Sequence, residues 1–168
     1  MTIIARTKHL TIRRLEPEDA PFFKELVNTP GWVQYIGQRN VHSDADALAY
    51  LEKGIFKSYR ESGYGFYMVE LTDGRLPLGI NGIVLRGSLP GPDFGFAFLP
   101  QHMGKGYAVE SSEAILNHVK KDLAIEELYA ISLPENERSL RLLEKLGFKN
   151  QGPIQLDNET LLLYRKDL

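Results

Sequence analysis

Leu99–Ser112 reads LPQHMGKGYAVESS and joins an alternating run of residues to a helical one. The preceding run, Asp93–Leu99 (DFGFAFL), alternates as a strand does, and Tyr107–Lys121 has the apolar spacing of an amphipathic helix. Gly104 and Gly106 lie between them, where glycine permits unusual backbone angles and close approach by a ligand. The first amides of a helix lack internal partners and carry partial positive charge. This stretch therefore predicts an anion site, best suited to a phosphate or pyrophosphate.

Two common phosphate motifs do not fit this turn. A P-loop requires G-x-x-x-x-G-K followed by Ser or Thr, whereas Lys105 is followed by Gly106 and the position five before Gly104 is Leu99. The dinucleotide fingerprint requires a third small residue after G-x-G-x-x, and Val109 occupies that position. Taken alone, the glycine pair favours a tight structural connection over a ligand site.

Two longer patterns favour the ligand site. Gln101, Gly104 and Gly106 match the Q/R-x-x-G-x-G/A motif of the GNAT superfamily of N-acetyltransferases. Asn136–Phe148 (NERSLRLLEKLGF) resembles the second GNAT signature, N-x-x-S/A-x-x-L-x-E-K-x-G-F, and follows a strand expected over Leu128–Leu133. The order and spacing of both motifs match the superfamily. Their residues are most similar to those of its ribosomal-protein N-acetyltransferase branch.

The composition narrows the class of protein. A length of 168 residues, with 43% hydrophobic and 25% charged residues, suits one globular domain spanning residues 1–168. The net charge of -2 gives no reason to expect nucleic acid or a membrane surface as the main partner. Because cysteine is absent and the histidines are scattered, we expect no disulfide, no cysteine nucleophile and no metal site. No leader or membrane-spanning stretch is apparent, so we expect a cytoplasmic protein.

The pattern along the chain predicts an α/β fold of mixed type, with about seven strands and about four helices. The strands are expected at His9–Leu15, Tyr64–Leu71, Leu78–Arg86, Asp93–Leu99, Leu128–Leu133, Phe148–Leu156 and Thr160–Arg165. The helices are expected from Glu16 to Asn28, Ser43 to Gly63, Tyr107 to Lys121 and Asn136 to Leu146, with a connecting segment at Gly31–Val41. This order predicts a central mixed, mostly antiparallel sheet with helices on both faces. The resemblance implies the GNAT fold, in which the two parallel strands before the motifs splay apart.

The resemblance also implies acetyl-coenzyme A as the donor, with no metal. Its pyrophosphate would lie on the backbone amides of Met103–Ala108, and its pantetheine arm would pair with backbone groups around Phe98 and Leu99 as an added strand does. Asn136 matches the family asparagine that reaches the cofactor, although it also suits a helix N-cap. The cofactor-binding residues implied are Phe98, Leu99, Gln101, Met103, Gly104, Lys105, Gly106, Tyr107, Ala108 and Asn136.

The implied reaction is direct attack of a neutral amine on the thioester within a ternary complex. A strand amide near Leu99 would stabilise the developing oxyanion. Leu143 occupies the position where many GNAT enzymes have a proton-donating tyrosine, so Ser139 is the alternative acid or a small packing residue. Asp93 is the first candidate for the base; Glu110 is the second, although an acid is expected in a first helical turn anyway.

The resemblance implies a primary amine as the acceptor, such as the N-terminus of a protein, and leaves a small polyamine, amino sugar or amino-acid-like toxin open. Trp32 and Tyr35 are candidate acceptor-binding residues, because the family places this region beside the acceptor, and packing under a loop is the alternative. Two rival classes are a non-catalytic acyl-coenzyme A-binding module, favoured by Leu143, and a nucleotide-phosphate enzyme that uses the glycine turn. A homodimer is common among relatives in that family.

Overall fold

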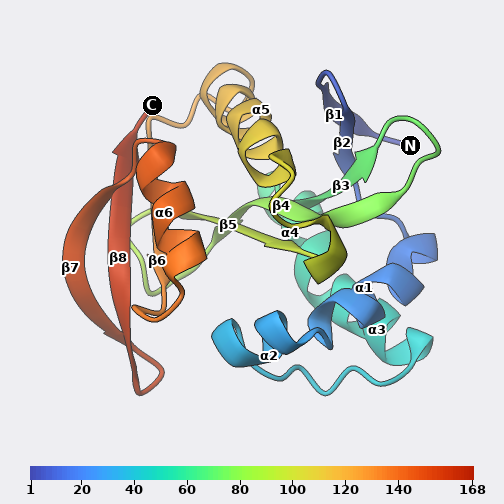
Figure 1. Cartoon of the computed structure of the whole chain (residues 1–168), viewed down its shortest axis with the longest axis horizontal. Coiled ribbons are helices and arrows are strands. Elements are labelled where there is room, and N and C mark those ends of the chain that lie inside the picture. The colour runs from blue at the N-terminus through green and yellow to red at the C-terminus, as the bar shows by residue number, and fades with distance from the viewer.

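Eight strands form one sheet in the computed structural model, which describes residues 1–168 (Figure 1). Their order across the sheet is β1-β2-β3-β4-β5-β6-β8-β7, and every neighbouring pair is antiparallel except β5–β6. The strands are β1 (Ile3–Arg6), β2 (Leu10–Arg14), β3 (Phe66–Leu71), β4 (Pro77–Leu85), β5 (Pro92–Phe98), β6 (Glu127–Ser132), β7 (Lys149–Leu156) and β8 (Glu159–Asp167). The expected mixed, mostly antiparallel sheet is confirmed.

Helices cover both faces of this sheet, as expected (Figure 1). One face carries α1 (Ala20–Val27), α2 (Pro30–Tyr35), α3 (Asp44–Leu51), a π-helical turn at Glu52–Phe56 and α4 (Lys57–Ser62), and the other carries α5 (Tyr107–Lys121) and α6 (Glu137–Lys145). Short 3-10 turns occur at Pro17–Asp19 and Pro100–His102. No helix combines the length and the apolar character needed to cross a membrane.

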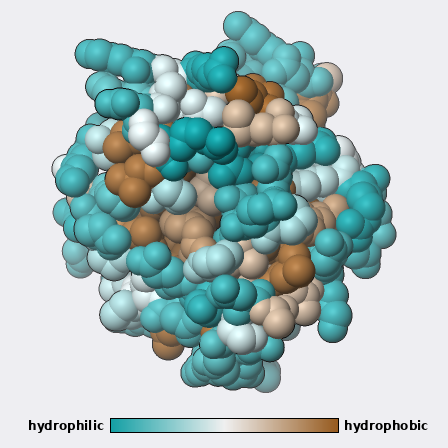
Figure 2. Space-filling view, turned by 90° about the vertical axis from the view of Figure 1, so that its right-hand side faces the viewer, coloured by the Kyte–Doolittle hydropathy of each residue, from teal (hydrophilic) through white to brown (hydrophobic).

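Two hydrophobic cores result from this layering. The larger core lies between the sheet and α5 and α6, where Ile115 and Val119 meet Phe94 and Leu128. The smaller core packs α1 and α3 against the opposite face of the sheet. The edge of the molecule that bears β1 is mainly hydrophilic, with small separate apolar patches (Figure 2). The helices α1, α3, α5 and α6 thus each bury an apolar stripe, as the amphipathic spacing predicts.

The structure corrects the expected elements in three places. Ile3–Arg6 forms an eighth strand, because it pairs with β2 as a short edge strand that has little pattern of its own. The expected connecting segment contains α2, with Pro30 at its first turn. The helix expected from Ser43 to Gly63 is interrupted by the π-turn, which contains Gly54, a weak helix former. Its two ends are as expected, with Ser43 as N-cap and Gly63 in the left-handed C-cap conformation.

The splay implied by the resemblance is confirmed. β5 and β6 pair only at Asp93 and Tyr129, near the start of both strands. β6 pairs with β8 along its whole length, Glu127–Ser132, and β5 stays paired with β4 as far as Phe98. Beyond Tyr129, β6 no longer pairs with β5. The sheet therefore opens between two parallel strands, and the glycine turn lies at the end of one of them (Figure 1).

Candidate functional site

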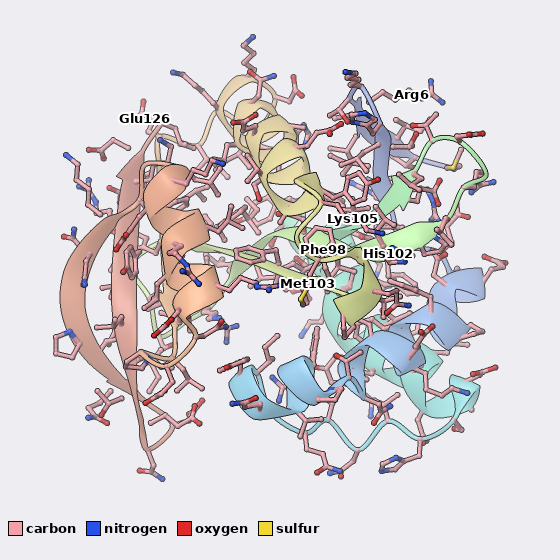
Figure 3. All side chains as sticks on the ribbon, viewed as in Figure 1. Arg6, Phe98, His102, Met103, Lys105 and Glu126 are labelled. Atoms are coloured by element: carbon pink, nitrogen blue, oxygen red, sulfur yellow. The ribbon has the colours of Figure 1, made fainter.

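A cleft of about 1680 Å³ lies at this opening and reaches both faces of the sheet. Its donor half, as we name it, is lined by the end of β5, the glycine turn and the adjoining ends of α5 and α6. Its acceptor half is lined by residues of α2, the π-turn and α4. Phe98 and Met103 lie where the two halves meet, close to the end of β5 (Figure 3). The splay thus joins two binding regions that the sheet would otherwise separate.

The glycine turn presents a row of free backbone donors. Gly104 and Gly106 have φ angles of 74° and 87°, which L side chains rarely adopt, and Gly106 is the N-cap of α5. None of the amides of residues 104–109 donates to a protein acceptor, and the first amide satisfied is that of Glu110, at 3.0 Å from the Gly106 carbonyl. The sequence-predicted anion site is therefore present as a geometric feature.

Met103 and Leu99 differ from their expected roles. The Met103 amide donates to the Pro100 carbonyl at 3.2 Å, so it is not one of the free donors. The Leu99 amide donates to the Leu78 carbonyl at 2.9 Å, and the Leu99 carbonyl accepts from the His102 amide at 3.0 Å. Its side chain is 4% exposed in the smaller core. The expectation that backbone groups of Leu99 pair with the cofactor is therefore wrong, because these groups are already bonded, and the Leu99 amide is not the expected oxyanion donor.

Phe98 has the free edge that was expected of it. Because Leu99 bonds to β4, the alternation along an antiparallel ladder turns the backbone groups of Phe96 and Phe98 the other way, toward β6. Beyond the Asp93–Tyr129 pair, β6 has diverged. Phe96 was missed by sequence reasoning, and the signal that identifies it is the period of two counted from Phe98.

The other turn residues surround the donor half unevenly. Tyr107 and Ala108 line the cleft, whereas Gln101 and Lys105 are exposed on the outer side of the turn. His102 was not expected to contribute, yet it is half-buried in the cleft wall (Figure 3). Burial, together with the nearby Lys105 charge, lowers the pKa of His102. The imidazole is thus neutral over a wider pH range than an exposed histidine.

α6 brings Asn136 and Ser139 into the donor half. Asn136 is the N-cap of α6, and its Oδ1 accepts from the Ser139 amide at 3.3 Å, while its side-chain Nδ2 makes no hydrogen bond within the protein. The Ser139 side chain is half-buried in the cleft wall. Leu143, at the position of the family tyrosine, is 1% exposed and packs in the larger core. Ser139 is therefore the hydroxyl that α6 offers to the cleft.

Asp93 lies at the closed end of the splay and is 3% exposed. It alternates with Gly95 and Ala97 on the face of β5 that looks toward α1–α4. Arg86 Nε donates to its Oδ2, whereas Oδ1 has no hydrogen-bond partner. Burial raises the pKa of Asp93 to about 6, against the opposing effect of Arg86. The carboxylate is therefore buried in the cleft wall with one oxygen free.

Glu110 has a structural role instead of the alternative role as base. Its carboxylate accepts from the Thr7 hydroxyl and from the His9 amide and ring Nδ1, the last two at 2.9 Å. These bonds lower the pKa of Glu110, despite some burial, and tie α5 to the β1–β2 turn. Glu110 does not line the cleft, so the structure leaves Asp93 as the acid of the two candidates that does.

Trp32 and Tyr35 both line the acceptor half. Trp32 packs edge-to-face on Phe23, with 6.2 Å between ring centroids. Part of this side chain therefore packs in the protein interior, which was the alternative to acceptor binding. Tyr50 joins them in the lining and stacks on Phe23 at 5.5 Å. The acceptor half is thus an aromatic wall supported from behind by α1.

Comparison with known proteins supports this geometry. A family model described as the acetyltransferase (GNAT) domain matches residues 9–149. The uncharacterized N-acetyltransferase YnaD of Bacillus subtilis is 27% identical over 146 residues, which cover 87% of this chain and 82% of that protein.

Two solved structures share the fold. An acetyltransferase from Agrobacterium tumefaciens has a TM-score of 0.83 at 23% identity, covering 99% of this chain and 94% of that one. The ribosomal L7/L12 alpha-N-protein acetyltransferase RimL in complex with coenzyme A has a TM-score of 0.78 at 16% identity, covering 99% and 98%. With the match to the family model over most of its length, the chain belongs to the GNAT family of acetyltransferases.

Proposed function

We propose that this protein transfers the acetyl group of acetyl-coenzyme A to a primary amine by direct attack within a ternary complex. The observation that carries the proposal is the row of free amides at the start of α5, placed beside the splay of β5 and β6. The coenzyme A complex of RimL, a structure of the same fold, supports this choice of donor.

The donor would lie along the splay. The amides of residues 104–108 bind its pyrophosphate, and the exposed Lys105 adds positive charge to the same turn. The backbone groups of Phe96 and Phe98 pair with the pantetheine amides as a neighbouring strand would. The side-chain Nδ2 of Asn136, which has no partner in the protein, donates to the same arm from α6.

The reaction follows from this placement. The amine nitrogen bonds to the thioester carbon, the C–S bond breaks, and the coenzyme A thiolate takes a proton from Ser139 or from water. Asp93 accepts the proton of the attacking amine through water. Water is needed because three strand residues, or about 10 Å, separate Asp93 from Phe96, beside which the pantetheine arm would lie. With a pKa of about 6, Asp93 is mostly ionised at neutral pH and can accept that proton.

One observation favours a second candidate function, a non-catalytic acyl-coenzyme A-binding module. Leu143 is buried where the family tyrosine would stand, so α6 offers no phenol to the leaving thiolate. This candidate predicts binding of acetyl-coenzyme A without turnover on any amine. The cytoplasmic location and the single domain over residues 1–168 stay predictions of the sequence, and a homodimer stays an expectation from the resemblance.

The first experiment is a calorimetric titration of the protein with acetyl-coenzyme A and, separately, with ATP. We expect binding of acetyl-coenzyme A, weak or no binding of ATP, and loss of binding in Gly106→Trp. Gly74→Trp is a matched control, because Gly74 has a similar φ of 74° in a turn outside the cleft. A screen of primary amines by mass spectrometry then tests turnover. No binding of acetyl-coenzyme A to folded protein would overturn the proposal, and binding without turnover would favour the non-catalytic candidate.

A further inference from the structure

The acceptor half of the cleft contains cations with few acidic partners. Arg39 and Lys53 line it, and neither forms an ion pair. The guanidinium of Arg39 makes its only hydrogen bond to the Ile36 carbonyl, at 3.4 Å. Lys57 also lines it, and its only acidic partner is Glu61, in an exposed ion pair at 3.9 Å. These three side chains, which we name the acceptor cations, are free to meet a ligand.

The charge of the cleft wall contrasts with that of the whole chain, which has a net charge of -2. The basic lining residues are Arg39, Lys53, Lys57, Arg86, Arg138, Arg141 and Lys145, and the acidic ones are Glu61, Asp93, Glu135 and Glu137. Asp93 is already paired with Arg86. An excess of cations around a concave, partly apolar site focuses a positive potential on the space inside it.

The donor accounts for only part of this excess. Arg138, Arg141 and Lys145 recur at helical spacing along α6, beside the glycine turn, where the phosphates of coenzyme A would lie. The acceptor cations lie on the other face of the sheet, on the segment after α2 and on the π-turn and α4 (Figure 1). A donor bound along the splay therefore leaves Arg39 and Lys53 without an anionic partner and Lys57 with only the exposed Glu61.

The π-turn explains why a lysine lines the cleft at this point. Ile55 and Phe56 are buried in the smaller core, while the adjacent Lys53 and Gly54 both line the cleft. A side chain at Gly54 would meet no heavy atom within 4 Å, so there is open space beside Lys53. The extra residue of a π-turn thus gives a cation room for a ligand, and such turns are frequent at functional sites.

We infer that the acceptor carries carboxylates beyond its amine and that the acceptor cations bind them. This inference rests on the proposed function and names its substrate class. Trp32, Tyr35 and Tyr50 would contact the part of the acceptor next to the amine. The N-terminal segment of an acidic peptide and a small amino dicarboxylate share this chemistry. Polyamines and sugars with several amines are disfavoured, because their additional ammonium groups would be repelled by the acceptor cations.

Trp32 provides a test that does not depend on turnover, because it is the only tryptophan in the chain and lines the acceptor half. Its fluorescence is followed while the protein, with coenzyme A present, is titrated with peptides of N-terminal serine followed by three glutamates, glutamines or lysines. We expect the glutamate peptide to bind about tenfold more tightly than the glutamine peptide, and the advantage to shrink as salt is added. Free glutamate forms a parallel arm, which distinguishes a small acceptor from a peptide.

Charge reversal identifies the residues responsible. Arg39→Glu and Lys53→Glu should each remove most of the preference for the glutamate peptide and improve binding of the lysine peptide. Lys121→Glu is the matched control, because Lys121 is an exposed lysine at the end of α5, outside the cleft, and it should change neither affinity. Retention of the preference in both cleft variants would overturn the assignment to these side chains.

The outcomes separate this inference from the proposed function. Equal affinity for the three peptides, or tighter binding of the lysine peptide, overturns the inference, even if all three are acetylated. Acid-selective binding without acetylation supports the inference about charge and removes the proposed catalysis in favour of the non-catalytic module. Acid-selective binding with faster acetylation of the glutamate peptide supports both.

Discussion

Two buried carboxylates of the sheet, Glu70 on β3 and Asp93 on β5, are equally hidden from solvent but are held differently. Glu70 is 2% exposed, and each of its oxygens has a partner, Arg13 Nε at 3.1 Å and Arg75 Nε at 3.3 Å. Asp93 has one arginine on one oxygen and nothing on the other. The first arrangement stabilises a fold, whereas the second leaves an acceptor free in a cleft wall.

The comparison teaches that burial alone does not identify a functional acid. Arg13 also binds both oxygens of Asp19, at 2.8 and 2.9 Å, so the first site is a closed network joining β2, β3 and the start of α1. These partners raise the pKa of Arg13, despite its burial. At Asp93 burial outweighs the single arginine and the pKa rises to about 6. Incomplete pairing within a cleft is therefore the distinguishing feature.

The largest effect is expected from breaking the closed network. Arg13→Met leaves Glu70 and Asp19 buried without their main partner, and we expect a loss of about 3–5 kcal/mol in the free energy of unfolding. Urea denaturation followed by circular dichroism measures it. Arg75→Met is the control, because that arginine is mostly exposed and should cost under about 1 kcal/mol. Equal costs for the two variants would contradict this account of the network.

Asp93→Asn tests the open site. Under the proposed function we expect kcat to fall about 100-fold and the ionisation near pH 6 to disappear from the pH–rate profile. Acetyl-coenzyme A binding should persist, because Asp93 lies at the closed end of the splay, away from the glycine turn. An unchanged profile in a folded variant would show that Asp93 is not the base.

The same substitution should change stability in a pH-dependent way. The pKa of Asp93 is raised from 3.8 to about 6 in the folded state, so the carboxyl contributes stability below pH 4 that is lost as pH rises through 6. Relative to Asp93→Asn, the natural protein should therefore lose on the order of 2 kcal/mol between pH 4 and 7. Thermal unfolding across this range measures the difference, and parallel curves for the two proteins would argue against the raised pKa.

Arg86→Met sharpens the comparison with the smallest expected effect. Arg86 lowers the pKa of Asp93 against the effect of burial, so its removal should raise that pKa further and move the pH–rate limb to higher pH. The shift should be modest, because Arg86 is about half exposed and partly screened. Arg60→Met, which removes an exposed arginine outside the cleft, should leave the limb in place. A limb that moves to lower pH would be inconsistent with this role for Arg86.

Much of the fold was predictable because its signals are local. The Asp93–Leu99 strand, the glycine turn and the helix from Tyr107 follow from alternation, helical spacing and glycine placement. β1 and α2 were missed because they are short and depend on partners elsewhere in the chain. The π-turn was missed because the apolar spacing of its helix is nearly continuous.

The candidate site was predictable where a single motif supplies it and uncertain where distant residues decide it. Most of the residues expected from the two motifs line the cleft, namely Gly104, Gly106, Tyr107, Ala108, Asn136 and Ser139. Leu99 and Met103 do not have their expected roles, because their amides donate to the carbonyls of Leu78 and Pro100. The acceptor cations were not predicted from the sequence. A local sequence pattern does not indicate which groups bond across a sheet, or that charges from three separate segments line one cleft.

The sequence by itself determined the glycine turn, because only glycine adopts positive φ cheaply at both of its positions, and an amphipathic helix follows it directly. It also determined the family, through two motifs of matched order. The tertiary structure decided which of two acids faces the cleft: Glu110 is bound by Thr7 and His9, about a hundred residues away, whereas Asp93 is buried with a free oxygen. Which acid faces the cleft depends on contacts between residues far apart in the chain. Those contacts are set by the packing of the whole sheet and not by any one segment.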